Sequence, residues 1–407
     1  MTASLQAYTR GAVLPSSNPF QRLAELLDGE SPGLDPIIMT IGEPQHAIPE
    51  FTASVLAENI GDFRRYPPIK GSQDFRNAVA GWLDRRYSLG GMIDPEDGVL
   101  PLNGSREGLS FGAIAARDQL DKGLDHPVVV LPNPFYQTYA AAAHVADARA
   151  VLLDAVPGNN FLPHLDSLDS DLLDETVAFY VASPTNPEGY PASLEYWQQL
   201  IGLARKHRFF IFADECYSEI YRNTPPPGIL EAAKAMGTGF ENIIVLNSLS
   251  KRSNLAGLRC GFAAGDSDFL RRWAKFRGLA APQVSLPAQA VAVRAYQDEA
   301  HVAENRRLYN EKFEVAERLL APQMGPVTPE GGFFLWLDVG KWADGVTVTK
   351  RLWRDIGVKV VPGGFLASDQ SDGSNPGRNF IRVGLTAPLQ QTEAALERMA
   401  NWLGEQA

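Results

Sequence analysis

Residues 243–261 read Ile-Ile-Val-Leu-Asn-Ser-Leu-Ser-Lys-Arg-Ser-Asn-Leu-Ala-Gly-Leu-Arg-Cys-Gly, an apolar run followed by a polar loop. The run Ile243–Leu246 is apolar at every position, which is typical of a strand buried on both faces of a parallel sheet. Lys251 lies in the loop that follows, and ligands of such sheets bind at the carboxyl ends of the strands. The sequence therefore predicts a ligand site that contains the Lys251 amine. The same loop carries hydroxyls at Ser248 and Ser250 and a guanidinium eight positions after the lysine, at Arg259.

The residue types around Lys251 suit one kind of chemistry. An amine that forms a Schiff base has to lose its proton, and burial and nearby positive charge lower the pKa of a lysine. Hydroxyl and guanidinium groups donate hydrogen bonds to phosphate. The loop thus indicates a Schiff-base lysine beside an anion site, and the alternative is an exposed lysine in a polar turn.

The middle of the chain alternates strand-like and helix-like segments. Further apolar runs of strand length occupy residues 128–131, 177–181 and 209–212. Helical stretches are expected over residues 105–120, 136–145 and 194–207. This alternation predicts an α/β architecture with helices on both faces of the sheet.

Polar or aromatic residues follow several of these strands. Asp214 ends one apolar run and Tyr217 follows it. A carboxylate against a pyridine nitrogen keeps that nitrogen protonated, and a phenol beside the ring hydroxyl tunes an imine. The alternative role for Asp214 is a cap of the next element. The turn 183–189 follows another strand, and Tyr136 follows a third, where an aromatic side chain either stacks on a flat ligand or packs in the core.

Gly104 and Ser105 stand where a helix is expected to begin. Free N–H groups at a helix start bind anions, and a glycine lets a phosphate approach closely. Ser105 is also a good helix N-cap, which is the alternative interpretation.

The pattern changes after Pro287, and we expect a smaller α+β domain there. A single long helix is predicted over Gln289–Leu320, because the next proline is Pro322. The remaining expectations are strands over 333–339, 358–361 and 379–383, helices over 346–356 and 389–403, and a surface loop over 367–378.

Composition excludes several classes of protein. The chain has 407 residues and a formal net charge of −11, which gives no general attraction for nucleic acid or anionic membranes. The two cysteines form neither a disulfide framework nor a metal-binding spacing, so we expect no metal. No signal peptide or membrane span is apparent, and a cytoplasmic protein is expected.

Taken in order, these motifs resemble the class I/II aminotransferases of pyridoxal-phosphate fold type I. The matching stretches cover nearly the whole chain. They are Ile41–Pro44, Tyr66–Gly71 with Phe75-Arg76, Asn103–Ser105, Tyr136, Pro184–Pro187, Asp214 with Tyr217, Ser248–Lys251, Arg259 and Phe380–Gly384.

The resemblance implies the architecture and the cofactor, pyridoxal 5′-phosphate. It implies a large domain with a mostly parallel seven-stranded sheet between helices, plus a smaller α+β domain. The expected division is an N-terminal segment 1–50 that joins the small domain, a large cofactor-binding domain 51–290 and a C-terminal small domain 291–407. The resemblance also implies a homodimer with shared sites, in which Tyr66 reaches the phosphate of the neighbouring subunit.

The resemblance implies a role for each matched residue. Lys251 holds the cofactor as a Schiff base and then moves the substrate α-proton. Asp214 pairs with the ring nitrogen, and Tyr217 and Asn186 contact the ring 3-oxygen. Arg382 binds the substrate α-carboxylate, helped by the backbone at Gly42, and Asn186 also lies at the substrate. Tyr136 stacks on the ring. The phosphate is bound by Ser105, Arg106, Ser248, Ser250 and Arg259.

Within this family the motifs are most similar to bacterial succinyldiaminopimelate aminotransferases. The implied reaction moves an amino group between N-succinyl-LL-2,6-diaminopimelate and 2-oxoglutarate by ping-pong kinetics, in lysine biosynthesis. One departure is Ala256, where that subgroup is expected to have proline. Arg65 and Lys70 are candidates for the remote substrate carboxylates. The alternatives are an aspartate, aromatic or LL-diaminopimelate aminotransferase, or a pyridoxal-phosphate C–S lyase.

Two other classes fit less well. Gly108–Gly112 matches the Gly-x-Ser-x-Gly pattern of serine hydrolases, but Ser110 falls inside a predicted helix instead of on a sharp turn. A cofactor-binding regulator would carry an added DNA-binding module, for which the chain has no spare segment.

Overall fold

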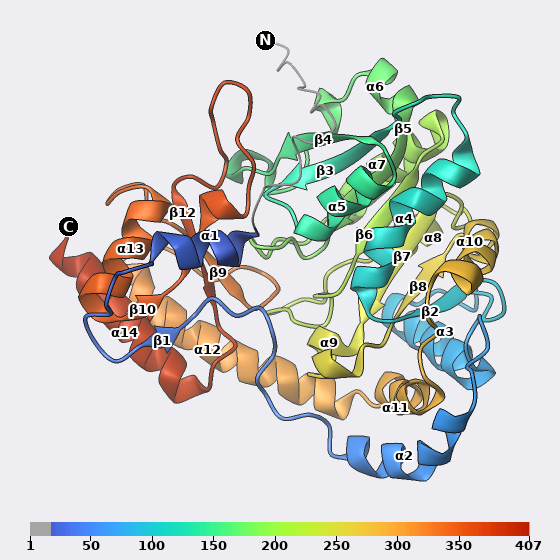
Figure 1. The fold of residues 1–407 in the computed structure, drawn as a ribbon, viewed down its shortest axis with the longest axis horizontal. Coiled ribbons are helices and arrows are strands. Elements are labelled where there is room, and N and C mark those ends of the chain that lie inside the picture. The colour runs from blue at the N-terminus through green and yellow to red at the C-terminus, as the bar shows by residue number, and fades with distance from the viewer. Residues whose placement is uncertain (1–17, 407) are drawn as a thin grey trace.

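The computed structural model describes residues 18–406, which form a large and a small layered part (Figure 1). The large part is built on one seven-stranded sheet in the order β2-β8-β7-β6-β5-β3-β4. The two pairs that β8 forms, with β2 and β7, are antiparallel and the other four are parallel, so the sheet is mostly parallel, as expected. The strands are β2 (Val99–Leu102), β3 (Val128–Asn133), β4 (Arg149–Asp154), β5 (Thr176–Ala182), β6 (Phe210–Asp214), β7 (Ile243–Ser248) and β8 (Gly261–Gly265).

The apolar runs are explained by burial on both faces of this sheet. In β3, Val128 and Val130 join one apolar cluster, whereas Val129 and Leu131 join the other. Successive side chains of a strand point to opposite faces, so a strand covered on both sides has no polar position. One face is covered by α3 (Gln73–Tyr87), α6 (Ser170–Glu175), α7 (Leu194–His207), α8 (Ile229–Ala235) and α11 (Leu286–Gln297), and the other by α4 (Ser105–Leu120), α5 (Gln137–Val145) and α10 (Ser267–Ala280).

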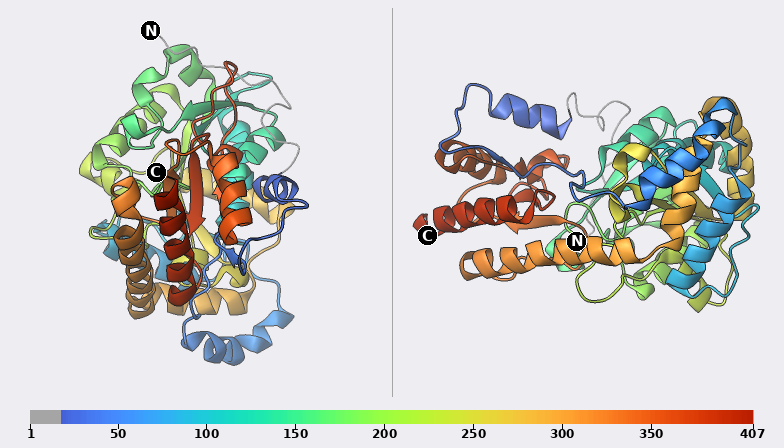
Figure 2. Two further views of the ribbon diagram at one scale, coloured as in Figure 1. Left: turned by 90° about the vertical axis from the view of Figure 1, so that its left-hand side faces the viewer. Right: turned by 90° about the horizontal axis from the view of Figure 1, so that it is seen from below.

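The small part is formed by both ends of the described chain (Figure 2). A three-stranded antiparallel sheet has the order β11-β12-β9, and β1 pairs in parallel with β10. The expected division was 1–50, 51–290 and 291–407, of which residues 1–17 lie outside the described residues. Because the second half of α11 packs in the core of the large part, we propose that the large domain ends at Gln297 instead of residue 290. The elements are α1 (Pro19–Leu26), β1 (Ile37–Ile38), α12 (Ala300–Met324), β9 (Phe334–Asp338), α13 (Gly345–Ile356), β10 (Val358–Lys359), β11 (Val361–Pro362), β12 (Phe380–Gly384) and α14 (Leu389–Glu405). Helix α2 (Phe51–Asn59) packs on α11, and the short α9 (Leu249–Arg252) carries Lys251.

The prediction of one long helix over Gln289–Leu320 is wrong. The chain leaves the helical conformation at Asp298, and α12 begins at Ala300. The Asp298 carboxylate accepts a hydrogen bond from the backbone N–H of His301, as a capping aspartate does at a helix start. The break comes from this capping residue and not from glycine or proline.

The expected strand 358–361 is two strands with different partners. β10 pairs with β1, and β11 pairs with β12. The chain therefore passes from one small sheet to the other between Lys359 and Val361.

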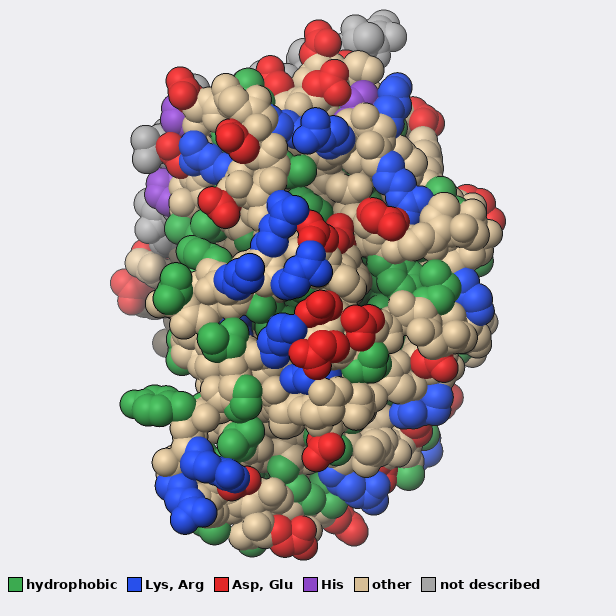
Figure 3. Space-filling view, turned by 90° about the vertical axis from the view of Figure 1, so that its right-hand side faces the viewer, with side chains coloured by type: hydrophobic (Ala, Val, Ile, Leu, Met, Phe, Trp, Pro, Cys, Tyr) green, Lys and Arg blue, Asp and Glu red, His purple; other side chains and the backbone are tan. Residues whose placement is uncertain are grey.

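The surface and the helices carry two further facts. On the face of the large part turned away from the small part, Lys and Arg side chains lie among Asp and Glu side chains (Figure 3). Within residues 18–406, no helix is long and apolar enough to cross a membrane, and no group of His, Cys, Asp or Glu is arranged to hold a metal ion.

Candidate active site

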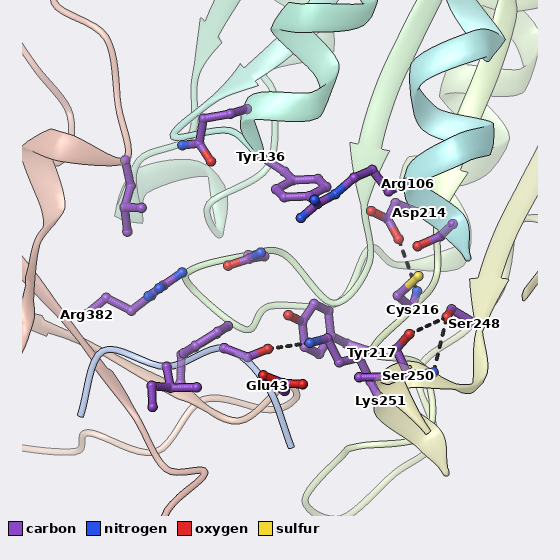
Figure 4. A pocket seen from close by; sticks show the side chains of 18 of the residues that line it. Glu43, Arg106, Tyr136, Asp214, Cys216, Tyr217, Ser248, Ser250, Lys251 and Arg382 are labelled. Atoms are coloured by element: carbon purple, nitrogen blue, oxygen red, sulfur yellow. Dashed lines mark hydrogen bonds between the residues drawn. The ribbon is translucent and has the colours of Figure 1, made fainter. Parts of the chain in front are cut away.

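A cavity of about 580 Å³ lies between the carboxyl ends of the large-sheet strands and the small part (Figure 4). Of the residues predicted for the site, Arg65, Tyr66 and Lys70 do not line it and all the others do. Ligand pockets commonly have volumes of this size and few converging polar groups. The lining residues that were predicted are Gly42, Ser105, Arg106, Tyr136, Asn186, Asp214, Tyr217, Ser248, Ser250, Lys251, Arg259 and Arg382.

Lys251 enters the cavity from α9, directly after β7. Its Nζ donates a hydrogen bond to the carbonyl oxygen of Gly42 and lies 5.3 Å from the centre of the Phe333 ring. Burial lowers the pKa of Lys251 to about 8, although the Cys216 thiol and the Glu43 carboxylate oppose this. Such an amine is deprotonated much more readily than an exposed lysine, as a nucleophile for a carbonyl requires.

Asp214 ends β6 and is buried. Its carboxylate accepts hydrogen bonds from the Tyr139 hydroxyl at 2.8 Å and from the Cys216 backbone N–H at 3.3 Å. Burial raises the pKa of Asp214, while these hydrogen bonds and Lys251 favour the charged form. A cationic partner in the cavity, such as a protonated ring nitrogen, would compensate the buried charge.

The start of α4 is shaped for an anion. Its N-cap, Gly104, has φ +79° and offers no capping side chain, so the first N–H groups of the helix lack a side-chain acceptor. A Cβ on Gly104 would stand 2.3 Å from a guanidinium nitrogen of Arg259. The glycine thus allows Arg259 to lie beside the helix start, where the helix dipole also favours negative charge.

Two hydroxyl groups from the turn between β7 and α9 complete the anion site at the start of α4. The Ser248 and Ser250 hydroxyl oxygens are 2.8 Å apart. Arg259 is held in place by its hydrogen bonds to the carbonyls of Ala256 and Asn103, at 2.8 and 3.2 Å. The residues present therefore fit a phosphate group.

Flat and aromatic side chains occupy the middle of the cavity. Tyr136 precedes α5, and its hydroxyl accepts a hydrogen bond from Arg106 Nε at 2.7 Å. Tyr217 packs edge-on against Phe333 and Phe334, and burial raises its pKa well above the usual value. Tyr136, Tyr217 and Asn186 all line the cavity.

Arg382 approaches from β12 of the small part. It is buried, lies over the Phe334 ring, and donates to the carbonyl of Thr40 at 3.2 Å. Its Nε has no hydrogen-bond partner, and within the described residues it forms no ion pair with a carboxylate. Burial lowers its pKa to about 10. A buried guanidinium with an unused donor is suited to bind a carboxylate ligand.

Several candidate residues lie outside the cavity. Tyr66 is 98% exposed, Arg65 pairs with Asp62, and Lys70 pairs with Asp97 at 2.6 Å. Ser110 lies inside α4, as expected.

A serine–histidine–aspartate chain does occur elsewhere. Ser253 Oγ is 2.9 Å from His301 Nε2, and His301 Nδ1 is 2.9 Å from Asp298. Ser253 is fully buried and does not line the cavity, so this chain has no access to substrate and connects the Lys251 loop to α12.

The sequence did not indicate all of the lining. Tyr139, the buried partner of Asp214 behind the lining, had one weak signal, its place one helical turn after Tyr136. Other lining residues were given no role, although Ile41 and Glu43 lie in the Ile41–Pro44 motif. They are Phe20, Thr40, Ile41, Glu43, Gln137, Cys216, Ala256, Phe334 and Leu366.

The fold and this cavity define a pyridoxal-phosphate enzyme of fold type I. The family described as aminotransferase class I and II matches residues 35–399. The chain belongs to this family, and its cofactor is pyridoxal 5′-phosphate.

Individual relatives agree with this assignment. An aminotransferase structure from Neisseria meningitidis is 35% identical with a TM-score of 0.87, covering 95% of this chain and 97% of that one. A probable N-succinyldiaminopimelate aminotransferase from Thermus thermophilus is 26% identical with a TM-score of 0.82, covering 94% and 100%. An LL-diaminopimelate aminotransferase from Syntrophobacter fumaroxidans is 30% identical over 90% of this chain and 91% of the relative.

Proposed function

We propose that this aminotransferase moves an amino group between N-succinyl-LL-2,6-diaminopimelate and 2-oxoglutarate, by ping-pong kinetics. The observation that carries the proposal is the pair of cations in the cavity. Arg382 and Arg106 lie on different sides of it, with Lys251 on the floor (Figure 4). This arrangement suits an amino acid with a second, remote carboxylate.

The roles of the residues that hold the cofactor follow from their chemistry. Ser248, Ser250, Arg259 and the first N–H groups of α4, at Ser105 and Arg106, would hold the phosphate. Asp214 would keep a proton on the ring nitrogen, and Tyr217 and Asn186 would contact the ring oxygen. Tyr136 would pack on the ring. When bound, pyridoxal phosphate supplies a ring that withdraws the electron pair left at the substrate α-carbon.

The reaction then depends on two residues that touch substrate. Arg382 binds the α-carboxylate, with the backbone at Gly42, and so orients the α-hydrogen. Lys251 Nζ takes the proton from the α-carbon, which its lowered pKa permits near neutral pH. The Gly42 carbonyl, which accepts from Nζ, keeps the amine on the substrate side of the cavity.

The remote carboxylates need another cation. Arg65 and Lys70 lie outside the cavity, with carboxylate partners of their own. Arg106 lines the cavity and is fixed by Tyr136, so we propose Arg106 for this role. Removing its side chain in Arg106→Ala should weaken the binding of dicarboxylate substrates and leave that of alanine-like donors unaffected.

LL-Diaminopimelate is a second candidate donor. The curated relatives of this chain include several LL-diaminopimelate aminotransferases. LL-Diaminopimelate has a free ammonium group where N-succinyl-LL-diaminopimelate has a succinylated amine. A carboxylate in the cavity wall, such as that of Glu43, would pair with this ammonium group.

A half-reaction screen tests the proposal. The loss of the cofactor absorption band is followed after mixing with N-succinyl-LL-diaminopimelate, LL-diaminopimelate, aspartate or phenylalanine. We expect the succinylated donor to react with the highest kcat/KM. A higher value for LL-diaminopimelate would reassign the donor, and release of ammonia and a pyruvate-like product without a keto-acid acceptor would indicate a lyase.

Borohydride reduction tests the attachment itself. We expect the cofactor mass on the peptide that contains Lys251. Its recovery on a different lysine would remove Lys251 from the mechanism.

A further inference from the structure

Lys312 is a buried cation that the reaction does not use. It lies on α12 with 2% of its surface exposed, and within the described residues it forms no ion pair with a carboxylate. Its Nζ donates to His46 Nε2 at 2.7 Å and to the carbonyl of Leu385 at 3.1 Å. Burying an ammonium group without an anion is costly, so these two acceptors carry its stabilisation.

Lys312 fixes the direction of the two hydrogen bonds made by the His46 ring. Burial lowers the pKa of Lys312 to about 8, and below that pH the protonated lysine only donates, so His46 Nε2 has to accept and the ring proton lies on Nδ1. His46 Nδ1 is 2.8 Å from Asn305 Oδ1 and donates to it. The Asn305 amide nitrogen then donates to the backbone carbonyls of Lys251 and Arg252, at 3.1 and 3.4 Å. The burial that lowers the pKa of His46 favours this neutral ring.

The chain Lys312–His46–Asn305, called here the relay, joins three segments that meet at the active site. His46 follows Gly42, whose carbonyl accepts from the Lys251 side chain. The Asn305 side chain donates a hydrogen bond to the backbone carbonyl of Lys251. Leu385 directly follows β12, the strand that carries Arg382. Hydrogen bonds thus connect the Lys251 backbone to Leu385, three residues after Arg382 in the chain.

We propose that His46 and Asn305 are positioning residues that set the place of Lys251 relative to Arg382. The inference rests on the proposed roles of those two residues, and it does not depend on which amino acid is the natural donor. The ring of His46 also packs on Tyr309 with centres 4.4 Å apart, which holds the imidazole in the plane that both hydrogen bonds require.

The first test separates the relay from simple packing. His46→Phe keeps an aromatic ring on Tyr309 and removes both hydrogen bonds, whereas His46→Gln keeps one acceptor and one donor at a similar separation. We expect kcat/KM to fall about tenfold or more in His46→Phe and to stay within about threefold of wild type in His46→Gln. Equal losses in the two variants would overturn the proposal.

The second test asks whether the members act as one unit. Lys312→Met and His46→Phe each break the relay, so the double variant should lose no more activity than the worse single variant. Multiplying losses would show independent effects and would contradict the relay. Arg318→Met is the matched control, because Arg318 also lies on α12 but is exposed and paired with Glu393, and it should react as wild type does.

The third test uses the substrate carboxylate. In single turnovers of the holoenzyme, Asn305→Ala should slow an amino acid that the wild type accepts much more than a simple amine without a carboxylate, because only the amino acid is held by Arg382. A similar slowing of both would mean that the variant only disturbs Lys251. If absorbance shows that Asn305→Ala holds less cofactor than wild type, the same comparison is made with Asn305→Ser. The comparison needs only an amino acid that the wild type accepts, so it remains valid if the half-reaction screen rejects N-succinyl-LL-diaminopimelate as the donor.

Discussion

Glu188 is a buried carboxyl group beside the site, at the end of the turn that carries Asn186. It is 2% exposed, its Oε1 has no hydrogen-bond partner, and burial raises its pKa to about 8. The folded protein thus retains a proton that the unfolded chain releases near pH 4.5. Stability therefore falls as pH rises from about 4.5 to about 8, by on the order of 5 kcal/mol relative to a group that does not titrate.

Glu188→Gln should therefore become more stable than wild type as the pH rises through this window. Urea unfolding at pH 5 and pH 8 measures the difference. Glu314→Gln, an exposed change on α12, is the control and should follow wild type. A stability difference between Glu188→Gln and wild type that does not change with pH would mean that the Glu188 carboxyl is already ionised at pH 5.

The Lys251 amine should make cofactor binding dependent on pH. Only the neutral amine attacks the aldehyde of pyridoxal phosphate, and the pKa of Lys251 is lowered to about 8. The rate at which the cofactor-free protein attaches the cofactor should rise with pH through about 8 and then level off. Stopped-flow absorbance measures this rate. Lys251→Ala should still bind the cofactor, but without this pH dependence and without turnover. If the binding rate in Lys251→Ala depends on pH as in wild type, a group other than Lys251 causes the dependence.

At the scale of elements, a third prediction concerns the junction between Gly104 and α4. A methyl group at Gly104 would collide with the Arg259 guanidinium and displace it from the helix start. We expect Gly104→Ala to weaken cofactor binding about tenfold or more, by analogy with the loss of a charged hydrogen bond. Equilibrium titration of the cofactor-free protein measures this change.

Gly123→Ala is its control, because Gly123 also has a positive φ but nothing lies within 4 Å of an added Cβ. Both substitutions strain the backbone, so both should lower the unfolding temperature. Only Gly104→Ala should change cofactor affinity. An equal loss in both variants would show that backbone strain, and not Arg259, is responsible.

Elements with a strong local signal were predictable from the sequence. The runs that became β3, β5, β6 and β7 are apolar at every position because both faces of the sheet are covered. The strand β8 was missed because Gly261–Gly265 consists mainly of glycine and alanine, which give no strand signal. The two glycines are needed because the backbones of Asn247 and Ile243 lie too close for a Cβ. The break before α12 was missed because one aspartate side chain makes it.

At the scale of the molecule, the site unites segments that no local pattern connects. Arg382 donates to Thr40, which is 342 residues earlier in the chain. Strand periodicity predicted that residue 382 lies in a strand, but only the resemblance to a family indicated its place at the substrate. Neither strand periodicity nor the family resemblance indicated Phe20 and Leu366. They line the cavity only because the small part packs against it.

The last prediction concerns the exposed Tyr66 and a second subunit. Its side chain is 98% exposed and does not line the cavity of its own chain, and the apolar side chains of Phe63 and Leu279 are exposed as well. We propose a homodimer in which Tyr66 donates to the phosphate in the partner subunit's site. Tyr66→Ala should then lose cofactor affinity although nothing in its own cavity has changed.

Mixed dimers test this arrangement directly. A dimer of one Lys251→Ala subunit and one Tyr66→Ala subunit has a single complete site if Tyr66 acts across the interface, because the functional lysine then faces the intact tyrosine. Subunits unfolded together and refolded in equal amounts should therefore recover about a quarter of the wild-type activity, measured with cofactor too dilute to saturate Tyr66→Ala alone. Refolding each variant by itself is the control. If the mixture is no more active than the average of the two separate preparations, Tyr66 acts within its own chain or not at all, and the shared site is wrong.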